Sequence, residues 1–293
     1  MKKKYSLIAF ILVTILLSSC DIFNTNFADI EKAEFYHSPQ LSQVPADIEE
    51  IMIMSWNIKF GGGRIDFFFD GWGDEVLMCE DEVLDNMSKI ASYINEAQPD
   101  IVLLQEVDID SKRSAYVDQV QFLLDNTYLN YGVYASQWKA DLIPSDGIGR
   151  MNSGNAILSH WEFDSAERIA LPLIGEQDAL KQYFYLRRNI LSTTLTIDNR
   201  ELSVLNTHTA AYSNDGTKKE QIDIFKEKLD EIESAGKLFV GGGDLNAIPP
   251  ESSNYLGTAF PDRPADLGKD FELEDYDTTE LEKLYQTYTP ALP

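Results

Sequence analysis

The sequence predicts an α/β fold, in which buried strands alternate with amphipathic helices in one large domain. Short apolar runs at 101–104 and 238–240 lack polar alternation, which is typical of inner strands in a sheet covered on both faces. Apolar residues recur at helical spacing over 83–94, 116–124 and 222–232. The chain has 293 residues, of which 44% are hydrophobic, so it contains enough apolar side chains for one extensive core.

Polar side chains that suit metal or phosphate chemistry lie at or next to the ends of five apolar segments. They are Asn57, Glu106, Asn155, His208 and the pair Asp244 and Asn246. A strand with a solvated tip explains any one of them alone, but together they indicate a site. Asp244 and Asn246 point to the same side of an extended chain, because side chains alternate with period two. The glycines at 241–243 allow the backbone to come close to a ligand.

The order of these segments resembles a known family. The motifs SWNIKF, DIVLLQEVD, GNAILS, LNTHT and GGDLN follow one another as in the endonuclease/exonuclease/phosphatase superfamily, which includes DNase I-like nucleases, neutral sphingomyelinases and inositol-polyphosphate phosphatases. The resemblance covers residues 51–255, and QE and GDLN are its most specific parts. It implies a four-layer αββα sandwich with the site at one end. It also implies hydrolysis of phosphoesters with a divalent metal, usually Mg²⁺.

The resemblance assigns a role to each of the strand-end residues. Glu106 becomes the main metal ligand with Asn57 beside it, an oxygen donor set that suits Mg²⁺, with Mn²⁺ as the alternative. Asp244 would orient the attacking water, and Asn246 would hydrogen-bond the scissile phosphate. His208 would donate to the phosphate oxygens as negative charge builds in the transition state.

Asn155, Arg188 and His160 receive interpretations of different kinds. Asn155 corresponds to the motif amide near the phosphate. Arg188 is a candidate for an additional phosphate contact, although the simpler interpretation, which we favour, is an ordinary surface arginine. His160 stands where the family often carries arginine, and we interpret it as a structural residue at a strand end, because the charge of histidine at neutral pH is not assured.

The C-terminal part of the family pattern has no counterpart in the sequence. Members of the family close with a Ser-Asp-His signature, whose histidine acts as general base on the water. The last of the three histidines here is His208, and the chain ends at Pro293. We therefore expect the C-terminal strands of the sandwich to be missing, on the order of 50 residues at usual strand and loop lengths. Loss of a general base typically removes about 10²–10⁴-fold in rate, so we expect an inactive or impaired enzyme.

The N-terminus has the pattern of an export signal. Three lysines at 2–4 precede an apolar stretch at 5–17, which is too short for an ordinary membrane span, and small residues lead to Cys20. A cysteine at this point resembles the bacterial lipobox, in which it is lipidated and becomes the first mature residue. An ordinary signal peptide with a chance cysteine is the alternative. We expect a lipid-anchored protein of the bacterial cell envelope.

The expected organisation follows from these boundaries: a signal peptide at 1–19, the lipidated cysteine and a polar tether at 20–50, and the family's domain at 51–293. After export only Cys79 would remain as a free thiol, so no intrachain disulfide is expected.

The charge of the chain bears on its partners. The formal net charge is −25, whereas nucleic-acid binders usually carry a basic footprint. Nucleic acid is therefore disfavoured as a substrate but stays open, and small phosphodiesters or phosphomonoesters fit better. The expected partners are a phosphate-ester substrate and, through the anchor, a membrane. The sequence does not indicate whether the protein is a monomer or an oligomer. The alternative function is a non-catalytic surface lipoprotein that uses the fold as a binding module.

Overall fold

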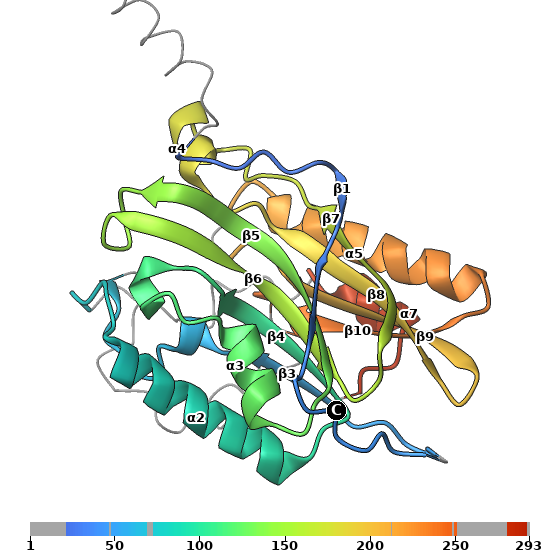
Figure 1. The fold of residues 1–293 in the computed structure, drawn as a ribbon. Coiled ribbons are helices and arrows are strands. Elements are labelled where there is room, and N and C mark those ends of the chain that lie inside the picture. The colour runs from blue at the N-terminus through green and yellow to red at the C-terminus, as the bar shows by residue number, and fades with distance from the viewer. Residues whose placement is uncertain are drawn as a thin grey trace, which may run out of the picture.

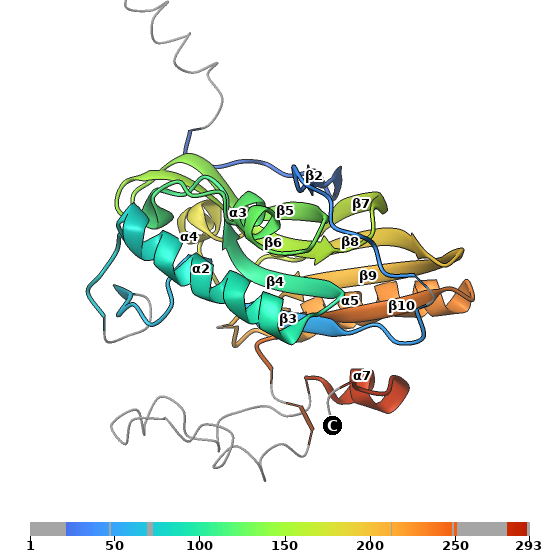
Figure 2. The same ribbon diagram turned by 60° about the horizontal axis from the view of Figure 1, so that its bottom comes forward.

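Two five-stranded sheets lie face to face at the centre of the structure, a computed structural model that describes residues 22–46, 48–68, 73–211, 213–247, 249–250 and 280–291. Helices α2 and α3 cover the outer face of one sheet, and α5 covers the outer face of the other (Figures 1 and 2). This arrangement confirms the α/β class and the four-layer αββα sandwich that the resemblance implied.

The two sheets have related strand orders. The first runs β2 (Glu34–His37), β5 (Tyr131–Ile143), β6 (Gly149–Ser159), β4 (Ile101–Asp108) and β3 (Ile53–Asn57), and the second runs β1 (Ile30–Lys32), β7 (Phe163–Ala170), β8 (Asn189–Ile197), β9 (Arg200–His208) and β10 (Leu238–Asp244). Each sheet has one parallel pair, β3 with β4 and β9 with β10, and its other neighbours are antiparallel. The strands of a parallel pair end at the same edge, which brings their last side chains together.

The three helices that the sequence predicted are present. Two extend beyond the predicted ranges 83–94 and 222–232 at both ends, and the third begins three residues and ends two residues later than the predicted 116–124. The helices are α2 (Glu80–Ala97), α3 (Gln119–Asn126), α4 (Ala179–Phe184), α5 (Thr217–Ser234) and α7 (Glu282–Thr287), and short 3₁₀ turns are η1 (Lys59–Gly61) and η3 (Lys112–Ser114). The apolar residues of α2 recur every three or four positions and are buried against the first sheet. Asp118 caps α3, because its side chain accepts a hydrogen bond from the backbone N–H of Gln121.

The apolar core alternates between layers along β4. Val102 and Leu104 pack with the helices outside the sheet, whereas Ile101 and Leu103 pack against the second sheet. All four side chains are buried, which confirms β4 as an inner strand.

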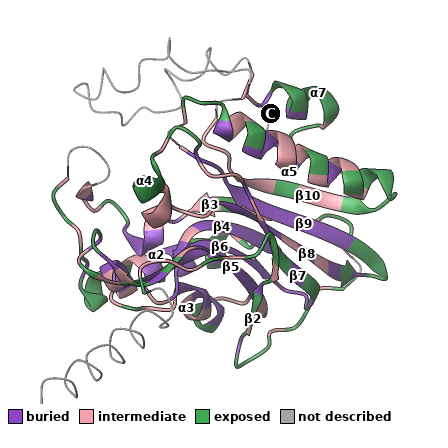
Figure 3. Cartoon of the chain, turned by 90° about the horizontal axis from the view of Figure 1, so that it is seen from above, coloured by how far each residue is buried: buried purple, intermediate pink, exposed green. Residues whose placement is uncertain are grey.

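The same expectation for 238–240 is wrong: within the described residues β10 pairs with β9 alone and forms an edge (Figure 3). An apolar run does not distinguish an edge strand from an inner one, because pairing depends on distant segments.

The segment expected to be a tether is partly folded. Its strands β1 and β2 pair with β7 and β5, so that a single short stretch contributes an edge strand to each sheet. Strands of three and four residues carry no readable period, and their formation is decided by the partner strand. Cys20 and the expected signal peptide lie outside the described residues. In the part of the chain that the structure describes, no helix is both long and apolar enough to cross a membrane.

One buried amide joins the two sheets. Asn206 of β9 donates through Nδ2 to the backbone carbonyls of Leu104 (2.8 Å) and Ala156 (2.8 Å), and its Oδ1 accepts from Nε2 of Gln105 (2.7 Å). The pairing of β4 with β6 shifts register between Leu104 and Val107. Because buried polar groups need partners, Asn206 both satisfies these groups and fixes the position of one sheet on the other.

We expect Asn206→Leu to lower the free energy of unfolding by roughly 2–5 kcal/mol, because each buried group left without a partner costs about 1–3 kcal/mol. Urea denaturation measures the loss. Asn214→Leu, at an exposed loop position, is the control and should change stability by less than about 0.5 kcal/mol. A loss no larger than that of the control would contradict the role given to Asn206.

Candidate active site

The side chains that end the parallel strand pairs meet at one end of the two sheets. Nδ2 of Asn57 donates to Oε1 of Glu106 (3.1 Å) and to Oδ2 of Asp244 (2.9 Å). Nε2 of His208 lies 3.7 Å from Oδ2 of the same aspartate. Four of the predicted site residues, two from each sheet, are therefore adjacent.

Glu106 reaches this position through an irregularity in β4. The strand shifts register between Leu104 and Val107, and Glu106 has a φ of 55°, in the left-handed region. Gln105 then points between the sheets, while the carboxylate of Glu106 lies half-buried beside Asn57. Bulges and strained backbone of this kind concentrate at functional sites, where they re-aim a side chain.

Arg188 corrects one interpretation from the sequence, because it is a buried residue and not a surface arginine. Arg188 directly precedes β8, and its Nη1 donates to Oε1 of Gln137 (3.0 Å). Its Nε has no hydrogen-bond partner in the described part of the chain. Burial lowers the pKa of Arg188, while the negative charges of Glu106 and Asp244 act in the opposite direction. The guanidinium therefore lies within electrostatic reach of both carboxylates.

His208 is buried between these charges. Burial lowers its pKa well below the usual value, and the positive charge of Arg188 lowers it further. The imidazole is thus neutral at pH 7, and its Nδ1 has no partner among the residues that the structure describes. A neutral imidazole still carries one N–H donor.

Among the residues that the structure describes, Asn155 and Asn246 make no hydrogen bond with Glu106 and bond to other parts of the site. Asn155 is fully buried, and its Nδ2 lies 3.4 Å from Oδ1 of Asn189, the residue after Arg188. Nδ2 of Asn246 donates to the carbonyl of Thr209 (3.0 Å), and its backbone N–H donates to Asp244 (3.0 Å). Asn246 therefore holds the turn after β10 in this structure.

His160 lies at the opposite end of the first sheet. Its backbone N–H donates to the carbonyl of Asp100, which precedes β4, and its ring packs 4.8 Å from that of Tyr128. Its interpretation as a structural residue at a strand end is confirmed.

Comparison with models of protein families identifies one that matches most of the chain. Residues 54–290 match the model of the Endonuclease/Exonuclease/phosphatase family. The chain belongs to this family. Members of the family are generally hydrolases that act on phosphoester or nucleic-acid substrates with divalent metal ions. Comparison with curated proteins by sequence gave no match.

Solved structures with a similar fold have low sequence identity. An endonuclease/exonuclease/phosphatase from Beutenbergia cavernae has 24% identity and a TM-score of 0.48, over 69% of this chain and 49% of that one. TDP2 from Caenorhabditis elegans has 22% identity and a TM-score of 0.41, over 68% of this chain and 48% of that one. The catalytic domain of human nocturnin has 20% identity and a TM-score of 0.45, over 78% of this chain and 72% of that one. This chain spans about half the length of the first two.

The donors at the centre fit the divalent cation that the family generally uses. Across the described ranges, no three His, Cys, Asp or Glu side chains are grouped to hold a metal ion. Mg²⁺ needs no such group, since one or two carboxylates with water and substrate phosphate are usual, and Glu106, Asp244 and the amide of Asn57 supply oxygens. The amide oxygen of Asn57 at present accepts from the backbone N–H of Lys59 (3.0 Å), so it must turn to act as a ligand.

Sequence reasoning missed the residues that support the site. Gln137 holds Arg188, Asn189 contacts Asn155, and Gln105 with Asn206 joins the sheets. Asn206 lies inside the motif LNTHT, so its position was marked although its role was not. Nothing in the sequence near Gln137, in the middle of a long strand, indicates a contact with Arg188.

The neutral state of His208 predicts a loss of stability at low pH. Its pKa in the folded protein is below the value of about 6.5 in the unfolded chain, so below pH 6.5 the unfolded state takes up a proton that the folded state does not. We expect this group to contribute up to about 1.4 kcal/mol per pH unit to the fall in unfolding free energy between pH 6.5 and 5. His208→Gln should remove that part of the slope in urea denaturation.

The matched control is His37→Gln, at an exposed position at the end of β2, which should keep the wild-type slope. An equal slope in wild type and His208→Gln would mean that His208 is protonated in the folded protein.

Proposed function

We propose that the protein is a divalent-cation-dependent phosphoesterase that hydrolyses small phosphodiesters or phosphomonoesters at the bacterial cell envelope. The observation that carries the proposal is the buried guanidinium of Arg188, which has no carboxylate within ion-pairing distance among the described residues. Burying a charge without a counter-ion is costly, and phosphate is the anion that a guanidinium matches best. A phosphate group at this end of the sheets would supply the missing partner.

In this proposal Glu106 and Asn57 hold Mg²⁺, with Mn²⁺ as the alternative. Bound there, the cation would neutralise charge on the phosphoryl oxygens as a Lewis acid. The two side chains come from neighbouring parallel strands and already lie within hydrogen-bonding distance of each other (3.1 Å). Their separation is therefore set by the sheet and needs no rearrangement of the strands.

The remaining side chains bind and orient the reactants. Arg188 and the N–H of neutral His208 donate to the non-bridging phosphate oxygens, and Asn155 lies beside them. Asp244 accepts a hydrogen bond from the attacking water and holds it in line with the phosphorus. The backbone N–H of Asn246 (3.0 Å) fixes the orientation of the Asp244 carboxylate. Asn246 lies next to this carboxylate as a further donor to the scissile phosphate.

The acidity of the chain supports small substrates over polymers. A net charge of −25 repels a polyanion that must lie along an extended surface, whereas a single phosphate group meets only the local field of the site. Lipid head groups and sugar phosphates fit this requirement.

The buried position of the Arg188 guanidinium predicts the effect of Arg188→Met. With bis(p-nitrophenyl) phosphate and Mg²⁺, we expect KM to rise about 10- to 100-fold, because a hydrogen bond to a charged group contributes about 1.5–3 kcal/mol. Arg200→Met, at the exposed first residue of β9, is the control and should leave KM unchanged. Chelation with EDTA should abolish turnover by the wild type.

Other results would change the proposal in defined ways. An unchanged KM in Arg188→Met would remove Arg188 from the substrate site. Binding of phosphate esters without turnover would favour the alternative, a non-catalytic surface lipoprotein that uses the fold as a binding module.

The envelope location rests on the N-terminal sequence and has its own test. In bacterial cells labelled with a radioactive fatty acid, the full chain should incorporate label and partition into detergent, and Cys20→Ser should do neither. Cys79→Ser is the matched control and should behave as the wild type, because Cys79 lies at the start of α2 within the domain. Label that persists in Cys20→Ser would contradict lipidation at Cys20.

A further inference from the structure

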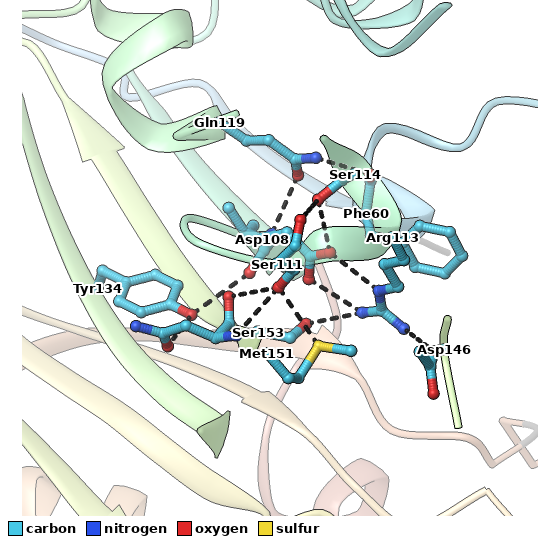
Figure 4. Close-up of polar contacts among 12 residues, drawn as sticks. Phe60, Asp108, Ser111, Arg113, Ser114, Gln119, Tyr134, Asp146, Met151 and Ser153 are labelled. Atoms are coloured by element: carbon cyan, nitrogen blue, oxygen red, sulfur yellow. Dashed lines mark hydrogen bonds and ion pairs between the residues drawn. The ribbon is translucent and has the colours of Figure 1, made fainter. Parts of the chain in front are cut away.

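A buried polar cluster joins the end of β4, the 3₁₀ turns η1 and η3 and the start of α3 (Figure 4). Arg113 donates through Nε and Nη2 to the two carboxylate oxygens of Asp108, each at 2.9 Å. Its guanidinium lies 3.9 Å over the ring of Phe60. Asp108 is completely buried, so this ion pair and its stacked ring form a rigid unit.

Gln119, the first residue of α3, connects two parts of this cluster. Its Nε2 donates to the backbone carbonyl of Phe60 (2.6 Å), and its Oε1 accepts from the backbone N–H of Asp108 (3.0 Å). Phe60 lies three residues after Asn57, and Asp108 lies two residues after Glu106. One fully buried amide therefore bonds the segment that follows each candidate cation ligand.

Both connected segments have strained backbone. Lys59 and Phe60 have φ values of 47° and 45°, and Glu106 has a φ of 55°. Non-glycine residues keep such conformations only where the surroundings fix them. The Phe60–Arg113 stack and the Gln119 amide are two independent contacts that fix these segments against each other.

Gly61 explains how Gln119 reaches the turn. A Cβ atom at this position would lie 2.9 Å from Nε2 of Gln119, and the φ of Gly61 is 70°. Glycine at this position leaves room for the amide beside the carbonyl of Phe60. Gly61 therefore serves this contact as well as the turn itself.

We propose that Gln119 is a positioning residue of the candidate cation site, which holds Asn57 and Glu106 at the separation that a divalent cation needs. The inference rests on the proposed function in one respect, the assignment of the cation to these two residues. Gln119 itself is hydrogen-bonded to the backbone on both sides and acts through the two segments that it joins.

The test is the affinity of the full chain for Mn²⁺ without substrate, measured by isothermal titration calorimetry. Gln119→Met keeps the length of the side chain and removes both hydrogen bonds, and we expect affinity to fall about 10- to 100-fold, as for other residues that orient metal ligands. Gln121→Met lies on the same helix, where its amide bonds to Asp125, and should bind as the wild type. Gly61→Ala should weaken binding as well, because its Cβ displaces the amide of Gln119.

Thermal unfolding separates positioning from a purely structural role. A folded Gln119→Met with wild-type affinity for Mn²⁺ and only a lower Tm would overturn the inference. Should that variant not fold, Gln119→Glu keeps the acceptor for Asp108 and loses the donor to Phe60; weaker Mn²⁺ binding supports the inference, and unchanged binding overturns it. Absence of Mn²⁺ binding in the wild type would instead remove the proposed function, and the inference with it.

Discussion

The amide of Asn206 is the contact on which the geometry of the site depends. One sheet carries Asn57 and Glu106, and the other carries His208 and Asp244, so the site exists only while the sheets keep their relative position. Apolar packing between sheets is not directional and tolerates small shifts. The amide of Asn206 instead makes hydrogen bonds with two carbonyls and one side chain of the opposite sheet. These bonds are directional and do not tolerate such shifts. Because Asn206 lies two residues before His208 on the same strand, the register that it fixes also fixes the imidazole against Asn57.

The irregularity in β4 gives two consecutive residues different functions. In a regular strand, Gln105 and Glu106 would point to opposite faces of the sheet. Here Gln105 points between the sheets to Asn206, while Glu106, with its φ of 55°, reaches the mouth where the strands end. A left-handed non-glycine residue costs about 1–3 kcal/mol. Contacts on both sides of Glu106 offset this strain, from Asn206 before it and from the buried carboxylate of Asp108 after it.

The sequence located the centre of the site because its signal is local. Glu106 and Asp244 each follow a short apolar run, and a buried strand that ends in an acid is visible without any knowledge of its neighbours. The burial of Arg188 was not visible, because it depends on Gln137, which lies 51 residues away on another strand. The edge position of β10 and the short strands within 30–37 depend in the same way on pairing with distant segments. Helices α2, α3 and α5 were predicted because a 3.6-residue period is also local, whereas the six-residue helices α4 and α7 were not predicted.

The balance of charge explains why phosphate binding and cation binding are coupled in the proposed function. Glu106 and Asp244 are acidic and Arg188 is basic, so when ionised these three groups sum to one negative charge, while His208 is neutral. Without a cation this site repels a phosphate. A divalent cation changes the sum to one positive charge. The single negative charge of a phosphodiester neutralises it, whereas the two negative charges of a phosphomonoester dianion exceed it. In a chain with a net charge of −25, an uncompensated negative charge at the site is opposed by the rest of the molecule as well. These electrostatics favour a diester over a monoester among the small substrates of the proposed function.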